Sequence, residues 1–538
     1  MALRHAKWII VSGGVLSGLG KGIVTSSIGR LLKDNYKVVP IKCDGYLNVD
    51  PGTINPYEHG EVFVLEDGGE VDMDFGHYER FLNIDCRFGW NLTSGKVFNS
   101  VIQKEREGKY LGQTVQIVPH VINEVKERLY RIARDERADI MIVEVGGTVG
   151  DIENMIFFEA VRQLRLEVGP HNLMYTHLTY VPELNSVGEQ KTKPTQQSTK
   201  LLQEAGIQPD VIIGRCDSPL TEKSKRKIAM FCNLNPEEVI SDPDMRTVYE
   251  LPLIFEREGL HRIIERKLAI KIRPNLTKWK RLVNTILGAK REVRIAMCGK
   301  YTELKDSYVS ISEALIHAGA NLNAKVSTRF IEATEIELGK IRIDDALKDV
   351  DGVIVPGGFG SRGGEGKIQM IRYLRENNIP FLGLCFGLQL AVAEFARDVC
   401  LLKKANSTEI DHKTPHPVIF IMPEQREITR KGATMRLGSH KAMLKPGSVV
   451  SRLYNSDVAY ERHRHRYEVN PLYHAILKGK GLVFSGMSPD STLVEYIELP
   501  GHRFFVGTQG HPELKSRLER PAPLFYGFVR ACLSKPVL

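Results

Sequence analysis

The residues best suited to nucleophilic catalysis are a cysteine between two glycines and a distant pair made of a histidine and a carboxylate. Cys385 stands in Gly383-Leu384-Cys385-Phe386-Gly387, between an apolar run and a helical pattern. This is the order of a nucleophile elbow, in which glycines permit a sharp turn and the start of a helix favours the thiolate. His511 and Glu513 could place an imidazole and an orienting carboxylate on one face of an extended segment. The three residues predict a Cys-His-Glu triad that releases ammonia.

Backbone amides near Cys385 could stabilise the oxyanion of such a reaction. Gly357-Gly358-Phe359-Gly360 follows a strand expected at 353–355, and the Phe386 amide offers a second donor. The alternative is that Cys385 is only a small buried apolar residue, the common fate of a cytosolic cysteine. The flanking glycines and the distant His-Pro-Glu favour the catalytic interpretation.

A glycine-rich turn near the amino terminus predicts a phosphate site. Gly13–Gly22 follows an expected strand and leads into a helix expected from Ile23. Backbone amides in such a turn and the amino end of a helix bind phosphates, and Lys21 adds a point charge. The turn departs from the strict P-loop, because its glycine spacing is one residue too long and Gly22 replaces the hydroxyl residue that contacts magnesium. A metal ion would therefore need ligands elsewhere.

Carboxylates at expected strand ends could bind that metal. Glu144 follows the buried run 140–143, so we expect it at the carboxyl edge, where open α/β sheets bind ligands. Asp72 and Asp74 would point to the same side if their segment were extended. Such oxygen ligands suit Mg²⁺, which relies on one or two carboxylates together with substrate phosphates. Acidic residues are more often surface or cap residues, but the glycine turn favours a functional interpretation.

Three further polar segments invite interpretation. Lys191-Thr192-Lys193-Pro194-Thr195-Gln196 offers charges and hydrogen bonds to a second nucleotide. In Glu461-Arg462-His463-Arg464-His465-Arg466 the alternating histidines could bind a metal, but the intervening arginines would repel it. We therefore predict an anion-recognising strand there. The basic run 223–227 is expected to be a solvated helix face.

The elements that must position these residues alternate along the chain. Short β-branched runs stand at 8–11, 37–41, 140–145, 210–213, 293–297, 352–355 and 380–384. Because helical patterns separate them, we predict an α/β protein with parallel sheets. A chain of 538 residues is too long for one core, and a basic, proline-containing stretch at 270–275 interrupts the pattern. We predict two doubly wound domains, a P-loop-like domain at 1–268 that uses a nucleotide and a triad domain at 292–538 that releases ammonia, joined by a linker at 269–291.

Composition limits the classes of function. The formal net charge of +9 is modest for this length, and it suits polyanionic small substrates, or merely a basic surface, rather than nucleic acid. The eight cysteines include no C-x-x-C pair, which argues against disulfides and structural zinc and favours a reducing cytoplasm. The amino terminus lacks the pattern of a secretory signal, and glycine and proline interrupt the longest apolar stretch, 379–393. We expect a cytoplasmic protein without a membrane segment or a nucleic-acid partner.

The chain resembles the glutamine-hydrolysing CTP synthases over essentially its whole length. The phosphate turn, the 191–196 segment and the triad occur in the order of that family, together with His59–Val64, Gly76–Phe81 and Gly146–Glu153. The resemblance implies that ATP phosphorylates the uracil 4-oxygen of UTP and that ammonia from glutamine displaces this phosphate to give CTP. It also implies Mg²⁺, activation by GTP, feedback inhibition by CTP, an internal ammonia path, and a homotetramer whose subunits share nucleotide sites.

The resemblance assigns roles by position. For ATP it implies Gly18, Leu19, Gly20, Lys21, Gly22, Ile23 and Asp74, with Lys21 and Lys42 near the transferred phosphate. For UTP or CTP it implies Ser17, Asp151, Ile152, Glu153, Lys191, Thr192, Lys193, Pro194, Thr195, Gln196 and Lys227. For Mg²⁺ it implies Asp74 and Glu144. For glutamine, beside the catalytic Cys385, His511 and Glu513, it implies Gly358, Phe386, Gly387, Leu388, Gln389, Glu409 and Arg466.

The sequence departs from the family pattern at three positions. Phe386 stands where we expect leucine, Gly510 where we expect phenylalanine, and Gly45 where we expect proline. The first change should be harmless, because only the backbone amide acts. The second removes an aromatic wall beside the catalytic histidine, and the third loosens a loop near the phosphates.

Two other interpretations remain open. The first is a different ATP-dependent amidoligase with a triad glutaminase, for instance one that acts on corrinoid side chains, since only 151–153 and 191–196 favour a uridine nucleotide. The second is a nucleotide-switched scaffold resembling the partition ATPases, or a filament subunit with a vestigial glutaminase. The intact triad argues against the second.

Overall fold

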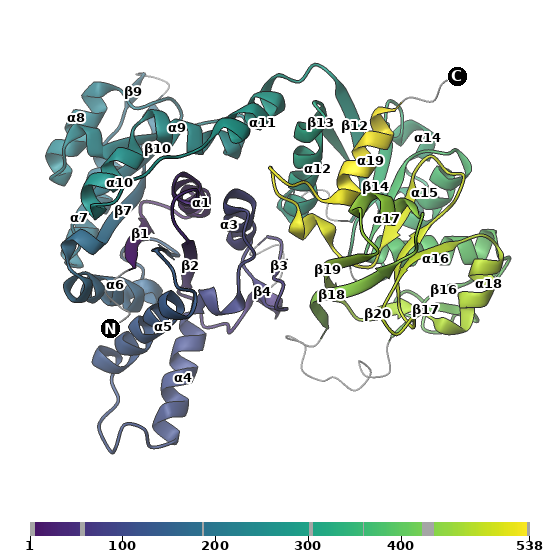
Figure 1. Ribbon diagram of the computed structural model, residues 1–538, viewed down its shortest axis with the longest axis horizontal. Helices are drawn as coiled ribbons and strands as arrows, with labels where there is room; N and C mark the ends of the chain where they lie inside the picture. Colours follow the sequence, from purple (N-terminus) through teal and green to yellow (C-terminus); the bar gives the residue numbers. More distant parts are fainter. Residues whose placement is uncertain are drawn as a thin grey trace. The chain divides into compact units, whose positions relative to one another are not determined.

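The computed structural model describes residues 6–53, 60–184, 188–300, 305–358, 360–421 and 435–534. The chain forms two compact units. Unit 1 comprises Met1–Pro51 and His77–Val283, and unit 2 comprises Gly52–Gly76 and Asn284–Leu538. Figure 1 shows most of unit 1 in purple to teal and most of unit 2 in teal to yellow. The domain limits at 268 and 292 stay a prediction, and helix α11 (Thr277–Gly288) lies within the predicted linker.

Unit 1 is built on seven parallel strands in the order β11-β10-β7-β1-β6-β2-β5. They are β1 (Lys7–Gly13), β2 (Val38–Asp44), β5 (Asn91–Thr93), β6 (Ile140–Val145), β7 (Leu173–Tyr180), β10 (Val211–Cys216) and β11 (Val239–Pro243). Their apolar residues are buried, as expected for parallel strands covered on both faces. The predicted strands of this half are confirmed. Because β1 lies between β6 and β7, its glycine turn opens at the carboxyl edge in the middle of the sheet.

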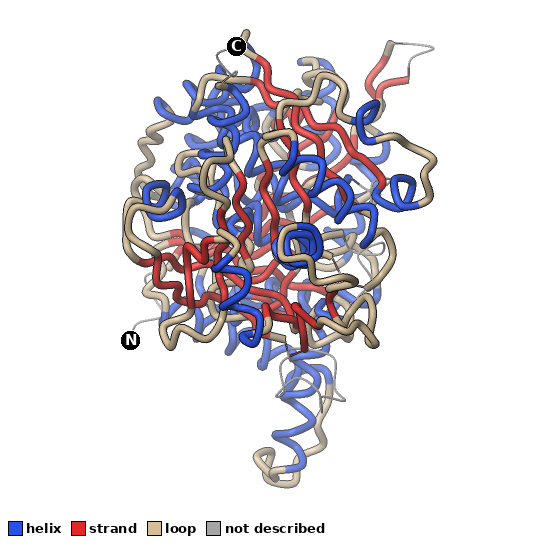
Figure 2. The backbone as a smooth tube through the Cα atoms, turned by 90° about the vertical axis from the view of Figure 1, so that its right-hand side faces the viewer, coloured by secondary structure: helices blue, strands red, loops and turns tan. Residues whose placement is uncertain are grey.

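The helices of unit 1 connect these strands. They are α1 (Lys21–Leu32), α4 (Ser94–Arg106), α5 (Ile122–Asp135), α6 (Met155–Val168), α7 (Lys193–Glu204), α8 (Glu222–Cys232), α9 (Leu251–Arg257) and α10 (Leu260–Leu268). Helix α3 (Asp74–Leu82) begins with the last residues of unit 2 and belongs to unit 1 from His77 onward. Helix α4 extends away from the sheet of this unit (Figure 1, Figure 2). Within the described ranges, no helix is both long and apolar enough to span a bilayer.

Unit 2 is built on nine strands in the order β13-β12-β14-β15-β23-β22-β21-β18-β19. They are β12 (Glu292–Gly299), β13 (Lys325–Glu332), β14 (Gly352–Val355), β15 (Phe381–Leu384), β18 (Arg436–Leu444), β19 (Val458–His465), β21 (Val483–Met487), β22 (Val494–Glu498) and β23 (Phe505–Thr508). The first five strands of this order are parallel and the rest are antiparallel. Smaller strands are β3 (Phe63–Val64), β4 (Glu70–Val71), β16 (Asn406–Ser407), β17 (Pro417–Ile421) and β20 (Tyr467–Val469).

Helices cover both faces of the unit 2 sheet. The main ones are α12 (Val309–Asn321), α15 (Gly364–Glu376), α16 (Phe386–Asp398) and α19 (Pro523–Leu533). Val353 and Val355 of β14 pack in one apolar cluster with α15 and α16, whereas Ile354 packs in another with α12 and α19. This alternation follows from the two-residue period of a strand. The predicted doubly wound α/β fold is confirmed.

Candidate active sites

The nucleophile elbow forms as predicted. Strand β15 ends one residue before Cys385 and helix α16 begins one residue after it. Cys385 has φ 49° and ψ −101°, a conformation rare for a residue with a side chain and typical of this turn. The Cys385 amide donates to the Thr508 carbonyl at 2.7 Å. Gly387 must lack a side chain, because a Cβ there would overlap the Val355 carbonyl.

The imidazole and carboxylate of the triad meet. His511 Nδ1 lies 2.7 Å from Glu513 Oε1. The segment is not extended as predicted, because Pro512–Lys515 forms a 3-10 turn. Burial opposes the charged imidazole, but the charges of Glu513 and Cys385 outweigh it and raise the pKa of His511 well above its usual value. A Cβ on Gly357 would lie 3.3 Å from His511 Cε1 and 3.6 Å from Cys385 Cβ, so the imidazole and the nucleophile flank this glycine.

The expected glutamine residues lie around the elbow. Phe386, Gly387, Leu388 and Gln389 form the first turn of α16, and Gln389 Nε2 donates to the Tyr467 carbonyl at 2.8 Å. Glu409 Oε1 accepts from the Gly360 amide at 2.6 Å, and burial raises the pKa of this carboxyl. Arg466 is half-buried between β19 and β20. Phe359 of the predicted oxyanion loop lies outside the described residues.

Sequence reasoning missed a buried lysine beside this loop. Lys367 of α15 is 1% exposed, and its Nζ would lie 3.8 Å from a Cβ on Gly358. Burial lowers the pKa of Lys367 to about 8. A lysine within an otherwise helical pattern gives no sequence signal of this placement.

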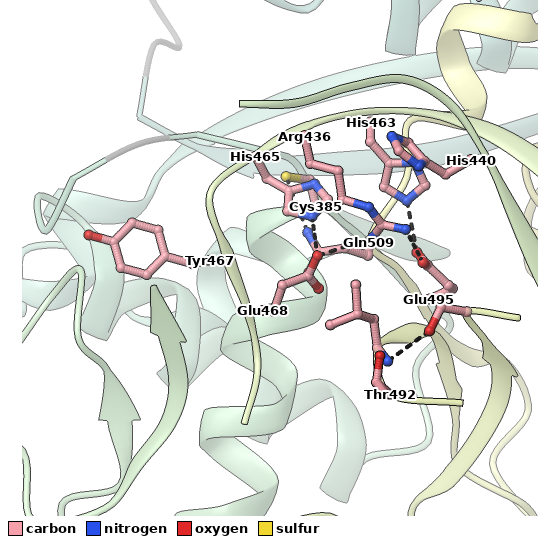
Figure 3. A network of polar contacts seen from close by, with 12 residues as sticks. Cys385, Arg436, His440, His463, His465, Tyr467, Glu468, Thr492, Glu495 and Gln509 are labelled. Atoms are coloured by element: carbon pink, nitrogen blue, oxygen red, sulfur yellow. Dashed lines mark hydrogen bonds and ion pairs between the residues drawn. The ribbon is translucent and has the colours of Figure 1, made fainter. Parts of the chain in front are cut away.

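Strand β19 recognises anions, but they belong to the chain itself. Arg462 Nε lies 3.0 Å from Glu66 Oε1, and Arg464 Nε lies 2.8 Å from Glu70 Oε1. The two histidines bond carboxylates as well, His463 to Glu495 at 2.8 Å and His465 to Glu468 at 2.7 Å, as Figure 3 shows. For these two arginines, the predicted recognition of anions is therefore directed at carboxylates of the same chain. In the part of the chain that the structure describes, no group of three or more histidine, cysteine and acidic side chains could hold a metal ion.

Gly510 is closely packed. A Cβ there would lie 2.8 Å from Glu461 Cβ and 3.4 Å from His463 Cε1. Residues of β19 thus occupy the space in which the family pattern would place an aromatic side chain at position 510. His511 is held instead through its amide, which donates to the Arg462 carbonyl at 2.8 Å.

The phosphate turn leads directly into α1. Gly20 caps the helix with φ 93°, a left-handed conformation that favours glycine, and α1 begins at Lys21 rather than at the expected Ile23. Lys21 Nζ donates to the Gly147 carbonyl at 2.7 Å. The loop that contains Ser17 and Gly18 is exposed, so its amides are accessible to a ligand.

Lys42 and Glu144 form a buried pair at the carboxyl edge. Lys42 Nζ lies 3.1 Å from Glu144 Oε1, and Tyr78 Oη donates to Oε2 of the same carboxylate at 2.5 Å. Glu144 is 0% exposed. Asp72 and Asp74 do not lie on an extended segment as predicted, because Asp74 begins α3 and its amide donates to Asp72 Oδ1 at 2.9 Å. Asp72 therefore caps a helix.

The expected uridine turn is ordered by its own side chains. Asp151 Oδ2 accepts from the Thr148 amide at 2.7 Å and from Thr148 Oγ1 at 2.5 Å. Ile152 is 86% exposed and Glu153 is exposed. A Cβ on Gly45 would overlap Asn154 Oδ1, so this glycine is closely packed. The expectation of a loosened loop there stays a prediction.

The segment 191–196 is the start of a helix rather than a loop. Helix α7 begins at Lys193, with Pro194 in its first turn, where proline is favoured. Thr195 is 0% exposed and its Oγ1 lies 3.0 Å from Thr179 Oγ1, so it holds the helix on β7. Lys191 Nζ donates to Glu189 Oε2 at 2.7 Å. Lys227 is exposed on α8.

Sequence reasoning also missed His177, which joins β1 to α7. Its Nδ1 lies 2.9 Å from Ser12 Oγ and its Nε2 lies 2.8 Å from Ser198 Oγ. Burial, with a smaller effect of the Lys21 charge, lowers the pKa of His177 to about 3. The neutral imidazole therefore connects the strand that carries the phosphate turn to the helix that begins with 193–196.

Comparisons with known proteins give matches over nearly the whole chain. Residues 7–270 match the family model described as CTP synthase N-terminus, and residues 303–531 match that of class-I glutamine amidotransferases. The CTP synthase of Thermococcus gammatolerans is 55% identical over 528 residues and covers 98% of both chains. That of Borreliella afzelii is 51% identical over 537 residues, covering 98% of this chain and 100% of its own. The solved glutaminase domain of Trypanosoma brucei CTPS with bound acivicin is 35% identical, with a TM-score of 0.42, and covers 46% of this chain and 96% of its own.

Proposed function

The chain belongs to the CTP synthase family, and from this premise we propose that it makes CTP from UTP, ATP and glutamine. Unit 2 hydrolyses glutamine, and unit 1 uses ATP to activate the uracil 4-oxygen, which ammonia then displaces. The protein is therefore an ATP-dependent carbon–nitrogen ligase of pyrimidine nucleotide biosynthesis with a glutaminase activity.

The observation that carries the glutaminase half is the His511–Glu513 contact beside the Cys385 elbow. The Cys385 thiolate attacks the glutamine amide carbon, and amides at Gly358 and Phe386 stabilise the oxyanion. His511 protonates the leaving ammonia and then activates the water that cleaves the thioester. Gly387, Leu388, Gln389, Glu409 and Arg466 complete the glutamine site.

Unit 1 supports the ATP-dependent half through its exposed glycine turn and the cation that follows it. The amides of 18–23 hold the phosphates, while Lys21 and Lys42 lie near the transferred group. Mg²⁺ would be held by Glu144 and Asp74, because carboxylate oxygens are the ligands that this ion prefers, and it would neutralise phosphate charge. The proposed UTP and CTP residues are Ser17, 151–153, 191–196 and Lys227. Among them Thr195 acts by holding α7, since it is buried.

Four further properties are proposed because the chain belongs to the CTP synthase family. They are activation by GTP, feedback inhibition by CTP, assembly into a homotetramer and a cytoplasmic location. Gel filtration with and without nucleotides tests the assembly directly.

The proposed function is tested by CTP formation from UTP and ATP with Mg²⁺, supplied in parallel with glutamine plus GTP or with ammonium chloride. CTP from both nitrogen donors supports the proposal. CTP from ammonia alone would restrict the proposal to unit 1. No CTP from either, with ATP still hydrolysed, would contradict it.

A further inference from the structure

The nucleophile has a neighbour that the triad chemistry does not use. Gln509 directly follows β23 and is 0% exposed. Its Nε2 lies 3.6 Å from Cys385 Sγ, within the range of a hydrogen bond to sulfur. Figure 3 shows the two side chains next to each other, with His465 and Glu468 close by. Gln509 thus contacts the reacting atom itself.

The orientation of the Gln509 amide is fixed from its other side. Gln509 Oε1 accepts from Gln389 Nε2 at 3.3 Å, and Gln389 Nε2 also donates to the Tyr467 carbonyl at 2.8 Å. A flipped Gln509 would place two amide nitrogens, both donors, against each other. The nitrogen of Gln509 must therefore face the sulfur.

Strand β23 and the residue after it hold the nucleophile at two points. The Cys385 amide donates to the Thr508 carbonyl at 2.7 Å, and the next side chain along, Gln509, contacts the sulfur. The backbone amide of Gln509 in turn donates to the backbone carbonyl of Glu495 at 2.8 Å, which fixes the Gln509 backbone. Backbone and sulfur of Cys385 are thus tied to the same segment.

The chemistry of this contact favours one state of the sulfur. An amide N–H can only donate, and a neutral thiol is a weak acceptor. A thiolate accepts a charge-assisted hydrogen bond, which is roughly twice as strong. The contact therefore stabilises the thiolate of Cys385, the form that attacks carbon. It also stabilises the thiolate that is released when water cleaves the thioester.

We propose that Gln509 positions the Cys385 sulfur for glutamine hydrolysis by donating a hydrogen bond to its thiolate, while Gln389 fixes the direction of that bond. This proposal rests on the glutaminase function proposed above. Gln509 is then a polar residue outside the triad that stabilises the reactive thiolate of Cys385.

Two variants separate the hydrogen bond from packing. Gln509→Leu removes the donor and the acceptor, whereas Gln509→Glu keeps an acceptor for Gln389 and removes the donor that faces the sulfur. Gln369→Leu, at an exposed position of α15, is the matched control. Alkylation of Cys385 by iodoacetamide, followed by mass spectrometry of its peptide from pH 6 to 10, reports the reactive sulfur. For each variant we would also measure glutaminase kcat and KM, together with CTP formation from added ammonia.

Loss of a hydrogen bond to a charged group predicts a drop of about 10-fold in both the alkylation rate at pH 7 and glutaminase kcat. KM should change less than about threefold, ammonia-dependent synthesis should persist, and alkylation should approach the wild-type rate at high pH. Unchanged alkylation and kcat in Gln509→Leu would overturn the proposal, as would an equal loss with both nitrogen donors, because that indicates a packing defect. If wild-type protein released no ammonia from glutamine, the proposed glutaminase function would fail instead, and the alkylation profile would still decide the role of Gln509.

Discussion

His511 Nδ1 and Glu513 Oε1 lie 2.7 Å apart across a single proline. The contact occupies one ring nitrogen, so the other is left for proton transfer with the thiol. The carboxylate also raises the pKa of the imidazole, against the opposing effect of burial. Glu513 therefore sets both the direction and the charge of His511.

Replacing Glu513 with glutamine should disable the glutaminase without unfolding unit 2. Glu513→Gln keeps the shape but removes the charge that favours the imidazolium, so the pKa of His511 should fall. We expect glutaminase kcat to drop at least about 100-fold, by analogy with other triads. Kinetics of ammonia release and NMR titration of the imidazole measure the two effects. Wild-type kcat in this variant would contradict the triad.

Adding one methyl group at Gly510 should destabilise unit 2. The new Cβ would lie 2.8 Å from Glu461 Cβ, and overpacking of this kind costs about 1–3 kcal/mol. Gly510→Ala should therefore unfold at lower temperature and hydrolyse glutamine more slowly. Gly479→Ala is the matched control, since a Cβ there meets nothing within 4 Å. Equal melting temperatures for Gly510→Ala and wild type would contradict this prediction, because they would show that β19 accommodates the methyl group without loss of stability.

Removing the Lys21 charge should stop synthesis with either nitrogen donor. Lys21 Nζ donates to the Gly147 carbonyl at 2.7 Å, which places the ammonium beside the phosphate turn. Loss of such a transition-state contact costs about 100- to 1000-fold in rate. Lys21→Met should lower CTP formation by that factor and leave the glutaminase intact. Lys200→Met, whose side chain is 76% exposed, should behave as wild type.

His177 should make unit 1 sensitive to acid. Its pKa is about 3 in the folded chain, because burial disfavours the charged ring, whereas an unfolded histidine has a pKa near 6.5. Below about pH 6.5 the unfolded chain binds a proton that the folded chain does not, so stability falls by up to about 1.4 kcal/mol per pH unit until about pH 3.

His177→Gln should remove that part of the pH dependence. The three tryptophans, Trp8, Trp90 and Trp279, all belong to unit 1, so their fluorescence during urea unfolding reports this unit alone. Between pH 7.5 and 5 the free energy of unfolding should fall less in the variant than in wild type. Parallel curves for the two proteins would show that His177 does not carry the effect.

The elbow, the glycine-rich turn and the alternation of strands with helices could be predicted because each leaves a local signal. Glycine marks the turns where no side chain fits, and apolar runs mark buried strands. The same local reasoning failed where a side chain binds nearby backbone. Asp72 accepts from the Asp74 amide and starts a helix, so the expected extended pair does not exist.

Other parts of the sites depend on residues far apart in the sequence. The partners of Arg462 and Arg464 are Glu66 and Glu70, almost four hundred positions away. No local pattern predicts such ion pairs, so the arginines of β19 seemed available to a ligand. Gln509 was equally hidden, because a single polar residue after an apolar strand matches no motif.

The most direct test of the account compares wild-type protein with Cys385→Ala in CTP formation from UTP and ATP. Wild type should form CTP with glutamine and with ammonium chloride. Cys385→Ala should lose synthesis from glutamine and keep the wild-type rate with ammonia, because unit 1 needs only free ammonia. Equal loss with both nitrogen donors would contradict the division of labour between the two units.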